Sequence, residues 1–267
     1  MAKTIIGHLE FLFTKPKDKL FVLNLHGTPK KFIKDFETQL DFLQNHFEII
    51  SPNQFFDLLY KKEKTNGNKL LLTFDDGLKN NLRALEVLNR KNISALFFIV
   101  PEFIDSNKPK EFYLKNIRPT INPHIDTESE DFTPLSWEDL KTISINHFIG
   151  SHSLSHTMLK SHRDSDFLAL EIVGSKKIIE EKLGITCESF CSINNSLLSL
   201  NASSKALIKK HYTYHFTTIA GCNYLSGPQF IKRINIESFW TIGAIKFSIG
   251  KININRNLKK ISEFESI

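Results

Sequence analysis

The sequence predicts an α/β fold in which parallel strands form a sheet or a barrel. Short apolar runs alternate along the chain with longer segments whose apolar residues recur every three or four positions, a pattern typical of strands followed by helices. The chain has 267 residues, of which 41% are hydrophobic, enough to bury one large core. We therefore expect a single α/β domain.

The first half of the chain supplies the opening elements of this pattern. Leu20 to Leu25 is predicted to be the first strand, and Ser51-Pro52 resembles a helix N-cap followed by a proline in the first turn. Lys61 to Asn68 is a polar loop, and Lys69 to Phe74 is predicted to be the next strand. The helical stripe between the first strand and Ser51 consists of Phe32, Phe36, Leu40, Leu43 and Phe47.

The second half continues the alternation of strands and helices. The expected elements are a helix carrying Leu82, Leu85 and Leu88, a strand at Ser94 to Val100, a capped helix at Ser136 to Ile143, a longer helix from Asp166 to Leu183 ended by Gly184, and a strand at Thr186 to Cys191. After Ile236 the pattern fades. We expect a domain over residues 20–240, an N-terminal extension over 1–19 and a peripheral tail over 241–267.

A polar stretch from Pro101 to Pro134 is too long for an ordinary connection between elements. It forms either a lid or substrate wall, or an insertion that does not contact substrate, and the sequence leaves both alternatives open. His124-Ile125-Asp126 within it is interpreted as incidental rather than as a second metal site.

The net charge of +6 and the pI near 9.0 do not indicate a nucleic-acid partner, because the lysines are spread along the chain without a basic stripe. The charge is consistent with solubility or with peripheral contact to an anionic glycan or membrane surface. No segment reaches the roughly 20 apolar residues of a membrane helix. Met1 to Lys19 lacks the pattern of an export signal, so we expect a cytoplasmic protein.

Three cysteines, Cys187, Cys191 and Cys222, do not match the usual zinc-ligand spacings. We interpret them as free thiols in the core. The sequence does not indicate an oligomeric state.

Two motifs carry the chemistry. Thr73-Phe74-Asp75-Asp76-Gly77 places two adjacent carboxylates at the end of an apolar strand, and Gly150 to His156 supplies two histidines four residues apart. One helical turn would place His152 and His156 on the same face, close enough to share a metal ion. Each motif alone also fits a surface turn or a solvated helix face, but parallel strands would bring both motifs to one sheet edge.

These motifs resemble those of the polysaccharide deacetylases, carbohydrate esterase family four, whose first motif is Thr-Phe-Asp-Asp-Gly and whose second is His-Ser/Thr-x-x-His. Similar flanking segments extend the resemblance over about residues 20 to 240. They include Leu23 to His26, Ile50 to Pro52, Ala95 to Ile99, Ser136 to Leu140 and Arg233 to Ile236. The resemblance implies a single-domain distorted (β/α) barrel and a carbohydrate N-deacetylase.

The resemblance also implies a role for each motif residue. Asp76, His152 and His156 would bind a divalent metal, with zinc as the first choice and cobalt, nickel or iron as alternatives. Asp75 would be the general base, because the adjacent cation favours its charged form.

The general acid of this family is usually a histidine in a late Leu-x-His motif, and the last histidine of this chain is His215. Some members are circularly permuted, with the equivalent strand first, and Leu23-Asn24-Leu25-His26 resembles that arrangement. We predict His26 as the acid. The alternatives are that His26 only caps a strand, or that His215 replaces it.

The third family motif departs from the usual pattern, since Phe190-Cys191-Ser192-Ile193-Asn194-Asn195 lacks the expected proline, tyrosine and glycine. We predict that Asn194 or Asn195 contributes the backbone amide for the oxyanion, and that Arg233 contacts substrate or steadies Asp75.

The predicted function is metal-dependent removal of the N-acetyl group from an amino sugar in a cell-surface glycan or its precursor. The alternatives are a catalytically silent glycan-binding protein on the same scaffold, an O-deacetylase or a deformylase.

Overall fold

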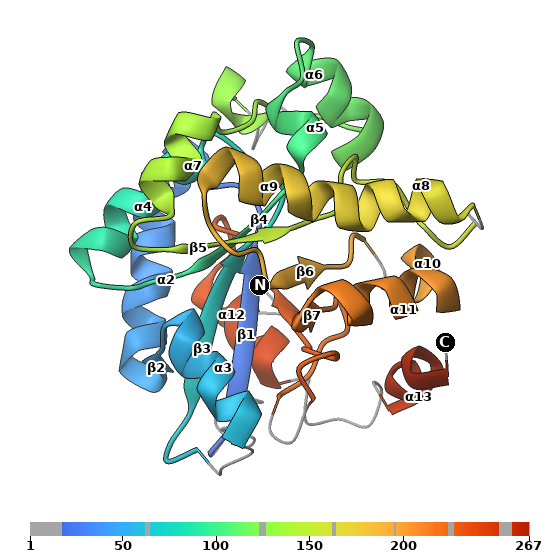
Figure 1. The fold of residues 1–267 in the computed structure, drawn as a ribbon. Helices are drawn as coiled ribbons and strands as arrows, with labels where there is room; N and C mark the ends of the chain where they lie inside the picture. Colours follow the sequence, from blue (N-terminus) through green and yellow to red (C-terminus); the bar gives the residue numbers. More distant parts are fainter. Residues whose placement is uncertain are drawn as a thin grey trace.

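Parallel strands form the centre of the fold, as the sequence predicts (Figure 1). The computed structural model describes residues 18–61, 65–122, 127–161, 164–194, 196–223, 227–250 and 258–266. The strands within this part are β1 (Leu20–Leu25), β2 (Glu48–Ile49), β3 (Lys69–Phe74), β4 (Leu96–Ile99), β5 (Phe148–Ser151), β6 (Ser189–Cys191), β7 (Tyr214–Phe216) and β8 (Ile234–Asn235). They form one sheet in the order β7-β6-β5-β4-β3-β1-β8, with β2 pairing β3.

The segment that leads into β8 connects the two edges of this sheet. Ile231 forms a parallel bridge with Phe216 of β7, whereas β8 pairs with β1 on the opposite edge. The backbone N–H of Ile231 donates to the carbonyl of His215 at 2.9 Å, and that of Thr217 donates to the carbonyl of Ile231 at 2.8 Å. The sheet therefore curls into a distorted barrel, which confirms the predicted single-domain α/β barrel.

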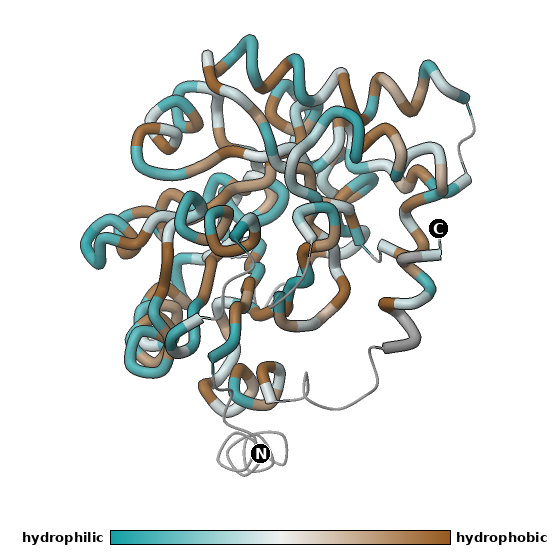
Figure 2. The backbone as a smooth tube through the Cα atoms, turned by 60° about the horizontal axis from the view of Figure 1, so that its bottom comes forward, coloured by the Kyte–Doolittle hydropathy of each residue, from teal (hydrophilic) through white to brown (hydrophobic). Residues whose placement is uncertain are grey.

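Helices pack around the sheet, with α2, α4, α7 and α9 visible along one side of it (Figure 1). Hydrophobic and hydrophilic residues alternate along the helical turns of the backbone (Figure 2), as expected when one face of a helix packs on the core. The α-helices are α2 (Ile33–His46), α3 (Pro52–Lys61), α4 (Asn81–Arg90), α5 (Pro101–Ile104), α6 (Pro109–Phe112), α7 (Trp137–Ile143), α8 (Ser165–Ala169), α9 (Ser175–Leu183), α10 (Ser196–Ser199), α11 (Ala202–His211), α12 (Ile242–Gly250) and α13 (Leu258–Ser266). Short 3₁₀-helices lie at η1 (Lys30–Phe32) and η3 (Ser129–Asp131), and π-helical turns at η2 (Tyr113–Ile117) and η4 (Leu170–Gly174).

The helix signals in the sequence have their expected physical basis. Ser136 caps α7 in a reciprocal capping box with Asp139. Gly184 ends α9 in a left-handed conformation with φ of 67°. The helix predicted over 166–183 is confirmed as one helical run from Ser165 to Leu183, in which the π-turn η4 lies between α8 and α9.

The core explains why the strands are apolar along their whole length. All six residues of β1 are buried, and only Lys69 of β3 is not, since elements cover both faces of a parallel sheet. A second apolar cluster joins Val22, Leu71 and Phe98 to Phe55 and other residues of α3.

The C-terminal region is not a peripheral tail, so the predicted boundary at residue 240 does not coincide with the edge of the core. Ile245 and Ile249 of α12 are buried in the main cluster. Phe264 of α13 is 1% exposed and stacks on Phe230 at 4.7 Å between ring centroids. The predicted extension over 1–19 lies almost entirely outside the described residues. In the described part of the chain, no helix has the length and hydrophobicity to span a membrane.

Candidate active site

The carboxyl ends of β1, β3, β5 and β6 converge on a pocket of about 460 Å³. His26 follows β1, Asp75 and Asp76 follow β3, and His152 follows β5. All four line the pocket, together with His156. Parallel strands present their carboxyl ends at one edge of the sheet, which is why motifs far apart in the sequence meet here.

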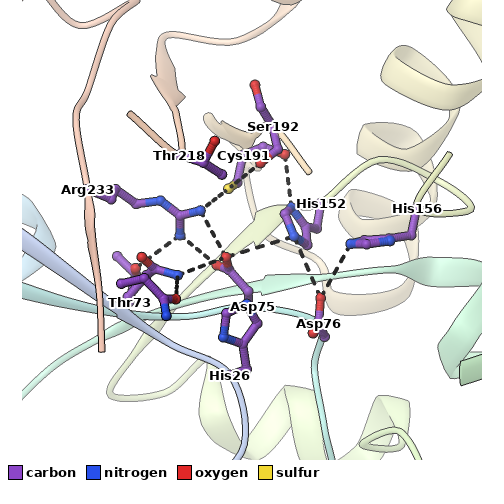
Figure 3. Close-up of polar contacts among 12 residues, drawn as sticks. His26, Thr73, Asp75, Asp76, His152, His156, Cys191, Ser192, Thr218 and Arg233 are labelled. Carbon is purple, nitrogen blue, oxygen red and sulfur yellow. Dashed lines mark hydrogen bonds and ion pairs between the residues drawn. The ribbon is translucent and has the colours of Figure 1, made fainter. Parts of the chain in front are cut away.

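The side chains of Asp76, His152 and His156 face one another (Figure 3). Asp76 Oδ1 lies 3.7 Å from His152 Nε2 and 3.6 Å from His156 Nε2, and all three residues are buried. These distances exceed ordinary hydrogen bonds. They are close to the edge of about 3.4 Å expected for a tetrahedron whose ligands lie about 2.1 Å from a central zinc.

Backbone carbonyls orient both imidazoles toward this gap. His152 Nδ1 lies 2.9 Å from the carbonyl of Cys191, and His156 Nδ1 lies 2.7 Å from the carbonyl of Asn116. A carbonyl can only accept, so each Nδ1 carries a proton and each Nε2 faces Asp76. Burial lowers the pKa of His152 to about 4, although Asp75 opposes the shift, so this imidazole is neutral near pH 7. The donor set fits a divalent cation.

The two histidines do not lie on a helical turn, so that expectation from the sequence is wrong. Ser153 and His156 adopt left-handed conformations, with φ of 64° and 60°, within an irregular loop after β5. Asp76 is also left-handed, with φ of 73°. Such conformations cost about 1–3 kcal/mol for non-glycine residues and cluster at functional sites. Tertiary contacts, rather than helical periodicity, bring His152 and His156 together.

Asp75 forms a buried, bidentate ion pair with Arg233 (Figure 3). Arg233 Nη1 donates to Asp75 Oδ1 at 2.6 Å, and Nη2 donates to Oδ2 at 2.8 Å. Burial raises the pKa of Asp75, but the charge and hydrogen bonds of Arg233, together with the nearby His152 and His26, outweigh it and lower the pKa to about 2. Arg233 is 1% exposed and is not among the described residues that line the pocket. The predicted contact of Arg233 with substrate stays a prediction, whereas the ion pair has the geometry to steady Asp75.

A second possible ligand set combines Asp75 and His152 with Cys191. Both Asp75 oxygens already accept from Arg233, and Arg233 Nη2 also lies 2.7 Å from Cys191 Sγ. Burial raises the pKa of the Cys191 thiol well above its usual range, despite the opposing Arg233 charge. The set built on Asp76 is therefore the better metal site. Cys187 and Cys191 are buried free thiols, as predicted, but Cys222 is only partly buried.

His26 lines the same pocket and pairs with Glu237, a residue that the sequence analysis missed. His26 Nδ1 lies 3.5 Å from Glu237 Oε1, and Asn235 Nδ2 donates to the same oxygen at 3.1 Å. Burial alone lowers the pKa of His26, but Glu237, Asp76 and Asp75 outweigh it and raise the pKa to about 9. The signal for Glu237 was its position directly after the Arg233 to Ile236 segment.

Of the two asparagines of the altered third motif, the structure describes one, and it lies at the pocket. Asn194 lines the pocket in a left-handed conformation with φ of 44°, whereas Asn195 lies outside the described residues.

His215, the alternative candidate for the general acid, is buried. Its Nε2 lies 2.6 Å from Ser192 Oγ, and it is absent from the described lining of the pocket. Burial, Lys205 and Arg233 lower its pKa to about 3. His215 therefore cannot replace His26 as the acid.

The polar stretch between Pro101 and Pro134 contributes a wall of the pocket. Tyr113, Ile117 and Arg118 line it, and the carbonyl of Asn116 holds His156. Of the two alternatives for this stretch, a pocket wall or an insertion away from the site, the structure supports the wall. His124-Ile125-Asp126 lies outside the described residues.

The fold is similar to those of several solved bacterial proteins. IcaB from Ammonifex degensii is 20% identical, with a TM-score of 0.66, over 82% of this chain and 92% of that chain. The deacetylase PplD from Streptococcus pyogenes is 15% identical, with a TM-score of 0.64, over 87% and 99%. The BpsB deacetylase domain from Bordetella bronchiseptica is 17% identical, with a TM-score of 0.64, over 83% and 98%. At these identities the likeness shows the fold.

No curated protein matches the sequence. The family model described as polysaccharide deacetylase matches residues 62–213, more than half of the chain. This match includes both the Asp-Asp motif and the two-histidine motif. The chain therefore belongs to the polysaccharide deacetylase family.

Proposed function

We propose that this protein is a metal-dependent deacetylase that hydrolyses the N-acetyl group of an amino sugar in a cell-surface glycan or its precursor. The observation that carries the proposal is the convergence of Asp76, His152 and His156 on one point beside the Asp75–Arg233 pair. Membership of the polysaccharide deacetylase family supports the same reaction class.

In this proposal Asp76, His152 and His156 hold the cation, with zinc as the first choice and cobalt, nickel or iron as alternatives. When bound, such a cation polarises the acetyl carbonyl and makes a water molecule a better nucleophile. The carbonyls of Cys191 and Asn116 keep both imidazoles in the ligand orientation.

Asp75 acts as the general base. Arg233 donates to both carboxylate oxygens, and Asn24 Nδ2 also donates to Oδ2 at 3.5 Å, so Oδ1 is the oxygen that keeps a lone pair able to accept a proton from the attacking water. Asp75 Oδ2 lies 3.9 Å from His152 Nε2, so the base sits directly beside the proposed cation site. Because its pKa is about 2, Asp75 is ionised throughout the neutral range.

His26 acts as the general acid that protonates the departing amine. A pKa of about 9 keeps it protonated near pH 7, as an acid must be before it donates. Glu237 stabilises this charged form and orients the ring through Nδ1, which leaves Nε2 for the leaving group.

The pocket is large enough for a sugar ring in addition to an acetyl group, since small-molecule sites typically enclose about 300–1,000 Å³. Its wall combines amide and hydroxyl groups, from Asn194, Asn235 and Thr218, with the aromatic rings of Tyr113 and Phe239. We assign the backbone amide of Asn194 as a donor to the oxyanion, because this residue sits at the pocket in a left-handed conformation.

The first test measures metal. The purified protein should carry close to one transition metal per chain, and His152→Ala should empty the site. His147→Ala is the matched control, because His147 is equally buried and flanks the same strand at its other end. Full metal occupancy in the His152 variant would contradict the ligand assignment.

The second test measures acetate released from a panel of N-acetylated and O-acetylated sugars and glycans. Asp75→Asn should retain metal but lose acetate release, because the amide cannot accept the proton. Release from O-acetyl substrates alone would identify an O-deacetylase, and formate from formylated substrates a deformylase. Glycan binding without any release by the wild-type protein would favour the silent binding protein.

A further inference from the structure

The loop that carries both histidines must be held in shape by its neighbours. Residues after β5 form no helix, and two of them, Ser153 and His156, are left-handed without being glycine. Each such residue costs about 1–3 kcal/mol, so the loop would relax if its contacts were lost. The position of the His156 imidazole therefore depends on groups outside the loop.

Two π-turns supply these contacts. From η4, the carbonyl of Glu171 accepts from the Leu154 N–H at 3.0 Å. From η2, the carbonyl of Asn116 accepts from His156 Nδ1 at 2.7 Å. A π-turn offers backbone and side-chain groups in positions that a regular α-helix does not, and such turns are frequent at functional sites.

The Glu171 side chain adds two further contacts. Its Oε2 accepts from the Ser155 N–H at 3.1 Å, and its Oε1 accepts from Ser155 Oγ. Glu171 is only 2% exposed, and among the described residues no Lys, Arg or His forms an ion pair with it. A buried carboxylate is costly unless its oxygens are satisfied, and here Ser155 satisfies both.

We infer that Glu171 is a positioning residue for the metal site, which it never touches. It fixes Ser155, the residue directly before His156, and so holds the left-handed turn that directs His156 at Asp76. The inference rests on the proposed function, because it assigns Glu171 a role in the affinity of that cation site.

The test compares zinc affinity and unfolding of Glu171→Ala with those of Glu180→Ala. Glu180 is the matched control: it lies on α9, one helix further along, and its Oε1 accepts from the Cys187 N–H at 3.0 Å in a loop without ligands. Affinity is measured by competition with a chromophoric chelator, starting from metal-free protein. Metal-free thermal unfolding reports the purely structural cost of each substitution.

Glu171→Ala should weaken zinc binding by about 10- to 100-fold, the usual effect of losing a group that orients a ligand. Glu180→Ala should leave the affinity unchanged, even if both variants lose stability. Glu171→Gln should recover most of the affinity, because its amide oxygen can accept from the Ser155 N–H while its NH₂ donates to Ser155 Oγ. The visible absorption of Co²⁺-loaded protein should change in Glu171→Ala alone.

Equal zinc affinity and equal Co²⁺ spectra in Glu171→Ala and Glu180→Ala would overturn the inference, while the proposed function would stand. A wild-type protein that binds no metal would overturn both. If Glu171→Ala does not fold, Ser155→Ala removes the hydroxyl contact only, and the same comparison with Glu180→Ala decides the outcome.

Discussion

Removal of the Arg233 guanidinium should expose how strongly the fold depends on the Asp75–Arg233 pair. Arg233→Met keeps a long apolar side chain in place but removes both hydrogen bonds to Asp75, at 2.6 and 2.8 Å. Removing one partner of a buried ion pair typically costs about 3–5 kcal/mol, because the other charge is left uncompensated. Independently, the lowering of the Asp75 pKa from 3.8 to about 2 corresponds to about 2 kcal/mol for that carboxylate.

The pH dependence of the free energy of unfolding tests whether the uncompensated Asp75 charge causes the loss of stability. In the wild-type protein the folded-state pKa of Asp75 lies below its unfolded value, so this stabilisation is fully present above about pH 4 and is lost as the pH falls through about 2. Without Arg233, we expect burial to raise the Asp75 pKa, with only His152 and His26 opposing it. The variant should then be most destabilised at pH 8 and partly recover at pH 5, where Asp75 takes up a proton.

The assay is urea unfolding of metal-free protein at pH 8 and pH 5, with Asp75→Asn/Arg233→Met as the control. The control has no buried charge at position 75, so it should lose less stability than Arg233→Met at pH 8 and change less with pH. This account of the pair would be refuted if Arg233→Met lowered the free energy of unfolding equally at both pH values. It would also be refuted if adding Asp75→Asn did not recover part of that loss.

Three further predictions follow from the site and the core. Glu237→Gln should lower the His26 pKa and move the basic limb of the kcat/KM profile to lower pH, because Glu237 contributes, with Asp76 and Asp75, to raising that pKa to about 9; an unmoved limb would contradict the acid assignment. Gly150→Ala should destabilise the fold by about 1–3 kcal/mol in thermal unfolding, since its Cβ would lie 2.6 Å from the Phe98 ring, and an unchanged Tm would show that the ring can move. Phe264→Ala should cost about 3–5 kcal/mol, and a neutral result in urea unfolding would show that α13 does not contribute to the core.

Local sequence signals were sufficient for most of the elements. The apolar runs at Leu20–Leu25 and Lys69–Phe74 became β1 and β3 with the predicted bounds, because strands covered on both faces must be apolar throughout. Local sequence patterns did not predict elements that are short or that are placed by contacts with residues far apart in the sequence. The two-residue β8 and the helix α12 carry little local pattern of their own, and their place is set by packing against β1 and the main core.

The sequence by itself determined the fold class, the family and the residue types that could hold a cation, since Asp75-Asp76 and His152/His156 follow strands whose ends must share one edge. Only the tertiary structure decided how these groups are used. The ion pair between Asp75 and Arg233, the contact of His26 with Glu237 and the support of His156 by Asn116 all join segments at least 40 residues apart. Periodicity describes neighbours along the chain, whereas these contacts depend on how the barrel closes.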